Sequence, residues 1–150
     1  MINRFERFSV DIMEIFHYWH TITSEEMAKY GLKGTHCTYF TVLSRYKEGV
    51  TATHLGRLCA KDKADVSRSV ALFEKKGLVV KENSVDNVYR ARIVLTDDGR
   101  KIADAIRERI AVAVEMAGEG ISEKERKIFY EALETITENL ARISHDGLPE

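Results

Sequence analysis

The stretch KDKADVSRSVALFEKKGLVV, residues 61–80, constrains the fold more than any other part of the chain. It opens with Asp62, a residue type that favours the cap of a helix, and reaches Gly77 directly after a pair of lysines. Between them, apolar residues recur at steps of four and three, which places them on one helical face: Val66, Val70 and Phe73. The stretch therefore predicts a helix with one buried face that stops at a glycine and turns into a strand.

The opposite face of this helix is shallow and polar. Ala64 and Ala71 would let the backbone come close to the edges of DNA bases. Ser67 is a short donor and acceptor, and Arg68 can bond a phosphate or a guanine. Asp65 has two interpretations: its carboxylate caps the helix's own N-terminus, or it accepts from a cytosine N4. This face has the features of a helix that reads the major groove.

Periodicity predicts helices on both sides of this one. A long first helix carries apolar residues over 5–22 and ends near Gly31, with a possible restart at Thr23 and Ser24. Thr51 caps a short third helix, on which Leu55 and Leu58 point inward. The other predicted helices are placed by their capping residues: Thr35 for the second, Thr96 for the fifth and Ser122, in a capping box, for the sixth.

A hairpin follows the quoted helix. LVVKE and RARIVL flank a polar turn, and alternation in the second strand puts Arg90 and Arg92 on one face, opposite Ile93 and Leu95. Two short helices followed by a hairpin make a winged helix-turn-helix. The sequence therefore predicts a mainly α fold of roughly six helices with a β-hairpin wing.

The charge distribution agrees with a polyanion-binding surface in the middle of the chain. Residues 51–96 carry nine basic and five acidic side chains, a balance of +4, although the 150-residue chain as a whole is at −1. No segment has the apolar length of a membrane span, and the N-terminal residues lack the pattern of a signal peptide. We therefore expect a soluble, cytoplasmic protein with no membrane partner.

These segments together resemble the multiple-antibiotic-resistance regulator (MarR) family of bacterial transcription factors, over nearly the whole chain. GVTATHLGRLCAKDKADVSRSVALFEKKGLV follows the family's helix, turn and recognition helix. LTDDGRKI matches the family's entry to the fifth helix, and GISEKE opens the last helix as the family does. The order and spacing of these pieces carry the resemblance, because no single piece is specific.

The resemblance implies one MarR-like domain over residues 1–150. Residues 35–100 would bind DNA, and residues 1–34 and 101–150 would be dimerisation helices, whose apolar stripes exceed what one small domain buries. We expect a homodimer that binds a pseudo-palindromic operator in double-stranded DNA, as a repressor released by a small aromatic or anionic ligand. The residues expected to contact DNA are Thr51, Lys61, Lys63, Ala64, Asp65, Ser67, Arg68, Ala71, Asn87, Arg90 and Arg92.

The wing departs from the family's pattern. An aspartate followed by two arginines is usual there, but the aligned residues are Asn87, Val88 and Tyr89, with Arg90 just after. Either Arg90 and Arg92 replace the usual pair, or the minor-groove contact is weakened. Arg90 is nearer the turn and is the arginine expected to enter the groove. The alternative is that both arginines only pair with acids such as Glu82 or Asp86 and stiffen the hairpin.

Several residues have a binding interpretation beside a structural one. Family members bind aromatic carboxylates between the dimerisation helices and the winged domain, so a ligand pocket would involve Phe16, His17, Trp19, His20 and Tyr39. The aromatic members of this set are otherwise core residues. His17 and His20 are three residues apart, within reach of one metal ion, but no third ligand lies at a fixed spacing. No metal or other cofactor is expected.

The two cysteines have different predicted roles. Cys59 is expected to be a small packed hydrophobic residue. Cys37 falls in the first turn of its helix, where the helix N-terminus would lower the pKa of the thiol, so it is a candidate redox sensor. The family's peroxide sensors, however, place their reactive cysteine in the first helix, which has none here.

An enzyme and a protein-interaction module are the two other function classes that a chain of this kind could belong to. No serine–histidine–acid cluster, glycine-rich phosphate loop or paired-carboxylate motif occurs, so an enzyme is not expected. A winged helix can also serve as a protein-interaction module, and this is the alternative to a DNA-binding regulator.

Overall fold

A computed structural model describes the backbone of residues 3–84 and 87–149, and their side chains except those of Phe5, Ser84 and residues 87–89. The elements follow one another along the chain as α1 (Arg4–Ala28), the 3₁₀ turn η1 (Gly34–His36), α2 (Cys37–Arg45), β1 (Val50–Thr51), α3 (Ala52–Cys59), α4 (Lys63–Lys75), β2 (Val79–Ser84), β3 (Asn87–Leu95), α5 (Asp97–Ala117) and α6 (Glu123–Asp146). The described chain forms two compact units, residues 1–111 and 112–150. The predicted mainly α fold with a hairpin is confirmed.

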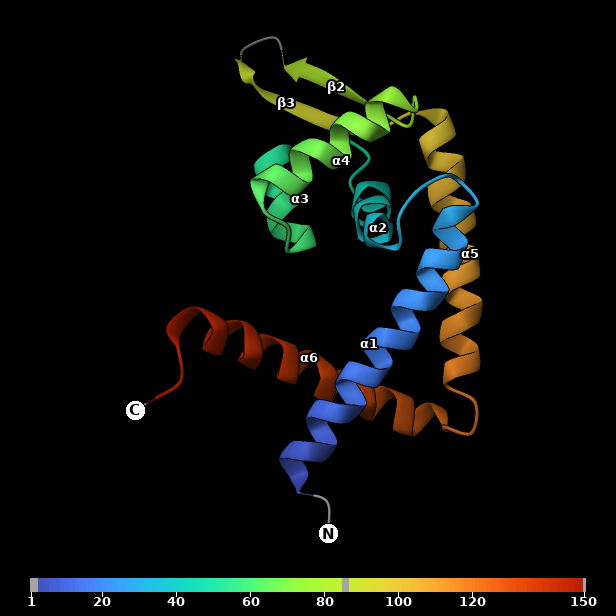
Figure 1. The fold of residues 1–150 in the computed structure, drawn as a ribbon, viewed down its shortest axis with the longest axis vertical. Coiled ribbons are helices and arrows are strands. Elements are labelled where there is room, and N and C mark those ends of the chain that lie inside the picture. The colour runs from blue at the N-terminus through green and yellow to red at the C-terminus, as the bar shows by residue number, and fades with distance from the viewer. Residues whose placement is uncertain (1–2, 85–86, 150) are drawn as a thin grey trace. The chain divides into compact units, whose positions relative to one another are not determined.

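The sheet of the first unit has three antiparallel strands in the order β1-β3-β2. β2 and β3 form the predicted hairpin, with Val79 opposite Leu95 and Glu82 opposite Arg92. The short strand β1 was not predicted, and it pairs Val50 with Ile93 on the other edge of β3. At its base β3 is therefore paired on both edges, while the far ends of β2 and β3 extend beyond the helices (Figure 1).

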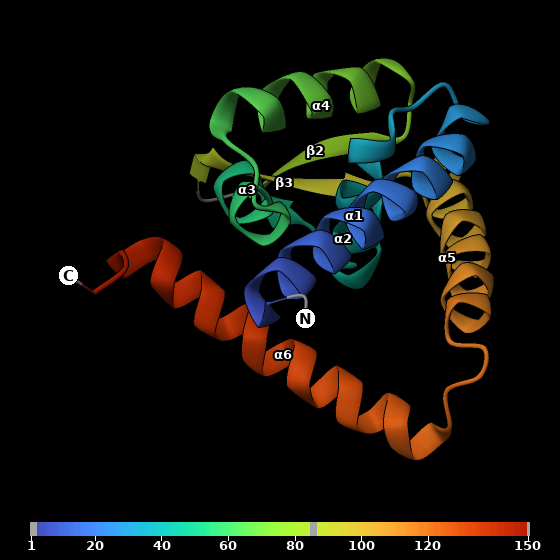
Figure 2. The ribbon, with the colours of Figure 1, turned by 60° about the horizontal axis from the view of Figure 1, so that its bottom comes forward.

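Helix α4 is held by its ends and by its buried face. The Asp62 carboxylate accepts from the Asp65 N–H at 2.7 Å, which confirms the predicted cap. Val66, Val70 and Phe73 are buried as predicted, and the Phe73 ring meets Phe40 edge-on at 5.0 Å. Figure 2 shows α4 along one edge of the first unit, with β2, β3, α3 and α2 all on the same side of it. Since the apolar face is fully packed, the outer face of α4 is the one left for a partner.

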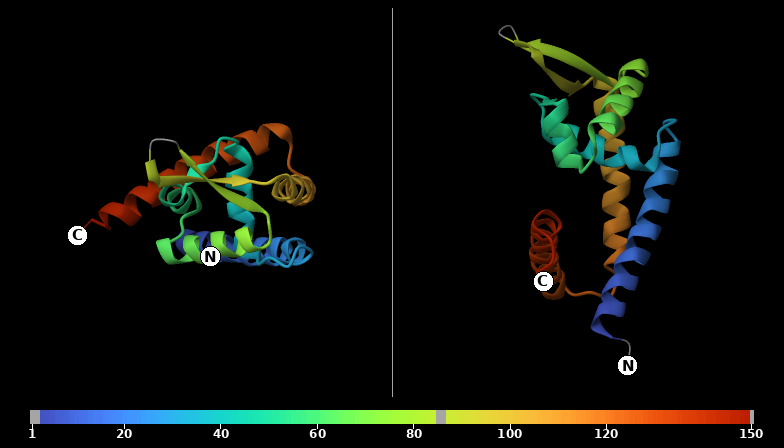
Figure 3. Two further views of the ribbon diagram at one scale, coloured as in Figure 1. Left: turned by 90° about the horizontal axis from the view of Figure 1, so that it is seen from above. Right: turned by 60° about the vertical axis from the view of Figure 1, so that its left-hand side comes forward.

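The end of α4 is joined tightly to the start of α5. Gly77 has a φ of +71°, the left-handed conformation that ends a helix. The Thr96 hydroxyl donates to the Gly77 carbonyl at 2.7 Å, and its N–H donates to the Leu78 carbonyl at 3.0 Å. Gly99 lies so close that any Cβ there would collide with the Leu78 carbonyl oxygen. β3 runs directly into α5 (Figure 3), so strand, turn and helix meet at one packed junction.

The second unit contains the end of α5 and the whole of α6. Ser122 and Glu125 form the predicted capping box, with the Ser122 N–H donating to Glu125 Oε2 at 2.8 Å. Arg126 ties the two helices together by donating to Glu115 at 2.9 Å and to the Gly118 carbonyl at 3.0 Å. No residue of α6 is buried within the described chain, and its apolar residues remain exposed: Ile128, Phe129, Tyr130, Ile136 and Leu140.

Three local predictions were wrong. Thr35 does not cap the second helix, because η1 precedes α2 and the Lys33 N–H donates instead to His36 Nδ1 at 3.1 Å. Leu58 does not point inward: it is 39% exposed, while Leu55 on the same helix is fully buried. The first helix does not restart at Thr23, since its hydroxyl donates to the Trp19 carbonyl within a continuous α1.

Candidate nucleic-acid interface

The outer face of α4 presents the predicted DNA-contacting residues to solvent. Ala64, Ser67, Arg68 and Ala71 are all exposed, and their neighbours on the inner face are buried. Two of the four side chains end at Cβ and one at a hydroxyl, so the helix backbone can come close to a flat or grooved partner. The physical arrangement is therefore the predicted one, and the DNA contacts themselves remain predictions.

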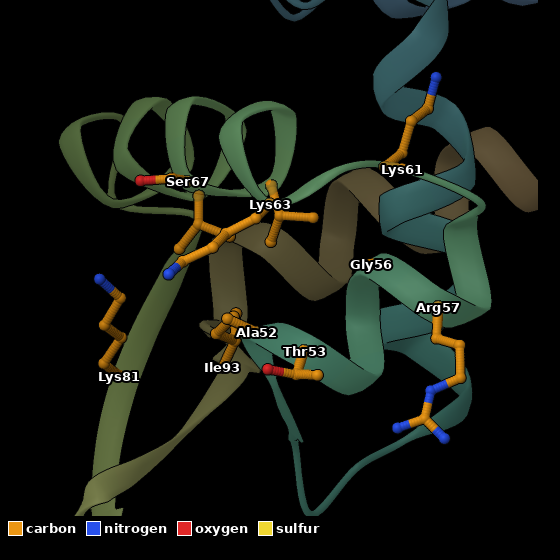
Figure 4. Close-up of a pocket in the computed structure, with 11 residues that line it drawn as sticks. Ala52, Thr53, Gly56, Arg57, Lys61, Lys63, Ser67, Lys81 and Ile93 are labelled. Carbon is orange, nitrogen blue, oxygen red and sulfur yellow. The ribbon is translucent and has the colours of Figure 1, made fainter.

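A hollow of about 430 Å³ lies between α4, α3 and the hairpin (Figure 4). Lys63 and Lys81 extend toward the same opening of this hollow, and the Ser67 hydroxyl projects from α4 beside them. Arg57 and Lys61 also border it, but their charged groups point away from the other two. The hollow therefore has an apolar floor and two convergent ammonium groups, which suits a phosphate better than an uncharged ligand.

A second hollow, of about 560 Å³, continues from this one along the hairpin. Arg57, Lys81 and Arg90 all border it, together with Thr51 and Thr53. Arg57 and Lys81 were not among the predicted DNA contacts. Lys81 lies two residues after the buried Val79, so alternation along the strand places both side chains on one face. Alternation over so short a strand is a weak signal in the sequence.

The two wing arginines have different surroundings. Arg90 is exposed, and it forms no hydrogen bond or ion pair with the side chains that the structure describes. Arg92 donates to the Gly49 carbonyl at 3.4 Å, across the pairing of β1 with β3. Among the described contacts neither arginine forms an ion pair with Glu82, although Arg92 lies opposite Glu82 in the hairpin. Asp86 lies outside the described residues, and so does the side chain of Asn87.

The Asp65 carboxylate does not cap its own helix, and its contact with a cytosine remains a prediction. Its carboxylate turns inward and accepts from the Tyr39 hydroxyl at 2.5 Å and from the Ser69 hydroxyl at 3.3 Å. The bond from Tyr39 is the main cause that lowers the pKa of Asp65, so this group is an anion at neutral pH. Capping is performed by Asp62 alone. The predicted cap was wrong because the hydrogen-bond partner of Asp65, Tyr39, is 26 residues away in sequence.

The predicted cap at Thr51 is confirmed, whereas Lys61 lies apart from Lys63. The Thr51 hydroxyl accepts from the His54 N–H at 3.3 Å, so this side chain caps α3, as predicted from its position. Lys61 borders a separate cavity of about 350 Å³ on the α1 side of the first unit, as well as the hollow beside α4. Its ammonium group points away from Lys63 (Figure 4), so the two lysines do not share one phosphate-facing surface.

The cavity that Lys61 borders contains three of the five predicted ligand-pocket residues. Phe16, Trp19 and His20 line it from α1, and several threonines line it from η1 and α2. The Phe16 and His20 rings stack with centroids 6.1 Å apart. His17 does not line the cavity, and Tyr39 is fully buried in the core on the other side of α2. The grouping of aromatic rings, hydroxyls and one ammonium group can accommodate a small aromatic anion.

Both cysteines are buried, and burial changes the expectation for Cys37. Burial is the main cause that raises the pKa of the Cys37 thiol, so the lowered pKa expected from the helix N-terminus is wrong. A raised thiol pKa leaves little thiolate at neutral pH, which argues against a redox sensor at this position. Burial also raises the pKa of the Cys59 thiol to about 11, as befits a packed hydrophobic residue.

Two negative findings apply to the described residues alone. Among them, no three histidine, cysteine or acidic side chains gather closely enough to hold a metal ion. None of the described helices has the length and apolar character to cross a membrane.

Comparison with known proteins gives one consistent fold. Residues 30–87 match the profile described as "MarR family". None of the curated proteins that were compared matches the sequence. A structure from Listeria monocytogenes, described as a MarR-family transcriptional regulator complexed with a 26-mer DNA, has a TM-score of 0.78 at 23% identity, covering 93% of this chain and 95% of its own.

Two further solved structures agree with this comparison. A MarR transcriptional regulator from Methanosarcina mazei has a TM-score of 0.82 at 19% identity, covering 92% of this chain and 99% of its own. MepR, a transcription regulator of the Staphylococcus aureus multidrug efflux pump MepA, has a TM-score of 0.69 at 17% identity, covering 88% of this chain and 97% of its own. At these identities the structures establish the fold of this chain, and the matching profile covers the helix-turn-helix segment.

Proposed function

We propose that this chain, whose residues 30–87 match the profile described as "MarR family", is a winged-helix DNA-binding transcriptional regulator that binds a pseudo-palindromic operator as a homodimer and represses transcription there. The observation that carries this proposal is the division of α4. The side chains of its inner face are buried, whereas its outer face carries short, exposed side chains and is flanked by ammonium groups. A helix of this kind enters the major groove and blocks the promoter by occupying it.

The contacts that we propose fall into two classes. Ser67 and Arg68, between the exposed alanines of α4, read base edges. Lys63 and Lys81 converge on one opening and neutralise a backbone phosphate there. Arg90 enters the adjacent minor groove, because it is exposed and unpaired among the described side chains. Arg92 braces the base of the wing through the Gly49 carbonyl.

The proposed dimer is formed by apolar surfaces that one copy leaves exposed. On α1, Ile12, Ile15 and Phe16 are exposed, and on α6 so are Ile128 and Leu140. A second copy of this chain is the partner that we propose, because self-association through such helices gives the two-fold symmetry that a pseudo-palindrome requires. The unit that contains α6 has few apolar contacts of its own, so it gains most from a partner.

A small aromatic anion is the ligand that we propose for release from DNA. The cavity lined by Phe16, Trp19 and Lys61 offers two aromatic walls and an ammonium group. Benzoate is a suitable probe, since it carries one ring and one carboxylate. If the cavity is the effector site, benzoate lowers operator affinity of the wild type and leaves that of Lys61→Ala unchanged.

Selection from a random DNA library tests the central proposal directly. The wild-type protein is expected to enrich a pseudo-palindrome with half-sites about 10 base pairs apart. A triple variant, Lys63→Ala with Ser67→Ala and Arg68→Ala, is expected to enrich nothing. Sedimentation velocity of the same wild-type sample at micromolar concentration is expected to give a dimer. If the wild type enriches no sequence, the protein-interaction module becomes the better explanation of the fold.

A further inference from the structure

An anion stands in the first turn of the helix that is proposed to face DNA. Asp65 is flanked along the chain by Lys63 and Arg68, both exposed cations on the same helix. A carboxylate that faced outward here would oppose both cations and repel the phosphates of a bound duplex. Interfaces commonly exclude wrong partners in this way, so the direction in which this carboxylate points matters for affinity.

The carboxylate is held inward by two buried hydroxyl groups. Oδ1 of Asp65 accepts from the Tyr39 hydroxyl of α2 at 2.5 Å and from the Ser69 hydroxyl, one turn along α4, at 3.3 Å. The side chain of Tyr39 is fully buried, and that of Ser69 is almost so. A buried hydroxyl that loses its acceptor is costly, so both donors oppose outward rotation of the carboxylate.

Tyr39 cannot follow the carboxylate if Asp65 rotates outward. Its ring meets Phe73 edge-on at 5.7 Å and His36 at 6.4 Å, within the packed core between α2 and α4. The same contacts anchor the hydroxyl at a fixed position beneath the first turn of α4. Tyr39 therefore acts on Asp65 from a rigid base, while Ser69 moves with α4 itself.

From this geometry we infer that Tyr39 is a positioning residue for DNA binding: it holds the Asp65 carboxylate on the inner side of α4 and so keeps it off the face on which Lys63 and Arg68 meet the phosphates. The inference rests on the proposed role of α4 in the major groove. It gives Tyr39 a function although this residue is buried and touches no DNA. It also explains how an acid is tolerated on a face that otherwise favours an anionic partner.

The test uses operator binding by the full-length protein, measured by fluorescence anisotropy at several salt concentrations. Tyr39→Phe removes one oxygen and leaves the ring in the core, and we expect it to weaken binding about five- to tenfold at low salt, the size of one screened like charge. The loss should shrink as salt rises, because the repulsion is screened. Asp65→Asn alone should change affinity less than threefold. Tyr39→Phe with Asp65→Asn should return affinity to within twofold of Asp65→Asn.

Tyr46→Phe is the matched control, because Tyr46 lies at the end of α2 against His54 and is not bonded to α4. It should bind DNA like the wild type. Thermal melting of every variant checks folding, and if Tyr39→Phe fails to fold, Ser69→Ala replaces it with an expected loss of about threefold at low salt.

The outcomes separate the inference from the proposed function. If the wild type has no operator, the proposed function fails. If the wild type binds and Tyr39→Phe binds equally well, Asp65 is not restrained by Tyr39 and the inference is overturned. If Tyr39→Phe weakens binding equally at all salt concentrations and Asp65→Asn does not rescue it, Tyr39 only supports the packing of α4, which also overturns the inference.

Discussion

Helices α4 and α6 are both amphipathic, but they place their apolar faces differently. On α4, Phe73 is fully buried within its own chain, whereas on α6 Phe129 is 50% exposed and no residue is buried. The same sequence pattern therefore has two outcomes. A helix whose apolar face is packed by its own chain is rigid before it meets a partner, and its polar face can serve recognition. A helix whose apolar face is exposed in one chain has the kind of surface that proteins bury against a partner.

The largest expected effect is on the free energy of unfolding, when Phe73 of α4 and Phe129 of α6 are each replaced by alanine. Phe73→Ala should lower the free energy of unfolding by about 3–5 kcal/mol, because a buried ring is lost from a packed core. Phe129→Ala should have a smaller effect that depends on protein concentration, because the ring would be buried only in the proposed dimer. Urea denaturation at two protein concentrations measures both. Equal, concentration-independent losses would remove the distinction between α4 and α6.

The open face of α6 should be sensitive to charge. Leu140→Asp places a carboxylate on the exposed apolar stripe. We expect it to raise the dissociation constant of the proposed dimer at least about a hundredfold, because burial of an unpaired charge is costly. Glu134→Lys, on the opposite side of the helix, is the control and should leave the dimer intact. Sedimentation velocity measures both variants. A dimer that tolerates Leu140→Asp would mean that α6 does not carry the interface.

The recognition face of α4 should be sensitive to truncation without any effect on folding. Arg68→Ala is expected to cost about 1–3 kcal/mol of specific affinity if the side chain reaches a base. If it contacts only phosphate, the loss should be uniform across sequences and the salt slope smaller by about one. Titration of the selected operator and of an unrelated duplex distinguishes the two. The melting temperature should not change, since Arg68 is exposed.

A smaller effect is expected at the wing. Arg90→Ala should cost about 1 kcal/mol on an operator whose wing-facing segment is rich in A·T pairs, because the narrow minor groove attracts arginine. The loss should be less where that segment is rich in G·C pairs. Binding titrations on paired operators measure the difference. Equal losses indicate a phosphate contact, and no loss at either site means that this wing does not touch DNA.

The smallest expected effect is the loss of stability at acidic pH that comes from protonation of His36. Burial is the main cause that lowers the pKa of His36 from its ordinary 6.5, with Lys33 and Lys61 adding to the shift and Asp65 opposing it. Neutral His36 therefore contributes stability that is fully present above pH 6.5 and is lost as pH falls below it. Thermal melts from pH 7.5 downward should find this loss reduced in His36→Gln but not in His145→Gln. Identical profiles for all three proteins would contradict it.

Local signals in the sequence predicted the ends of helices correctly where one side chain acts on a nearby N–H. Asp62, Thr51 and Ser122 all accept from a backbone N–H three residues ahead, and this geometry depends on few other residues. The inner face of α4 was equally predictable, since its period needs no knowledge of the partner. The fold class followed from these elements and their order.

Contacts between distant residues were not predictable. Strand β1 exists because Val50 meets Ile93 on β3, and two residues give no periodicity to read. The inward turn of Asp65 depends on Tyr39, which is 26 residues away. The outward position of Leu58 reflects which side of α3 its neighbours cover. The different directions of the Lys61 and Lys63 side chains likewise depend on the turn before α4: both border the hollow beside α4, but only Lys61 also borders the cavity next to α1.

The joint between α4 and α5 determines how motion passes through the molecule. Thr96 bonds the carbonyls of both Gly77 and Leu78, and the absent side chain of Gly99 lets the two segments touch. Because bending this turn would break these hydrogen bonds, we expect a tilt of α5 to carry α4 with it. A long helix that is fixed to a short one in this way acts as a lever. In the proposed dimer, the distance between the two α4 helices would then depend on the angle of α5.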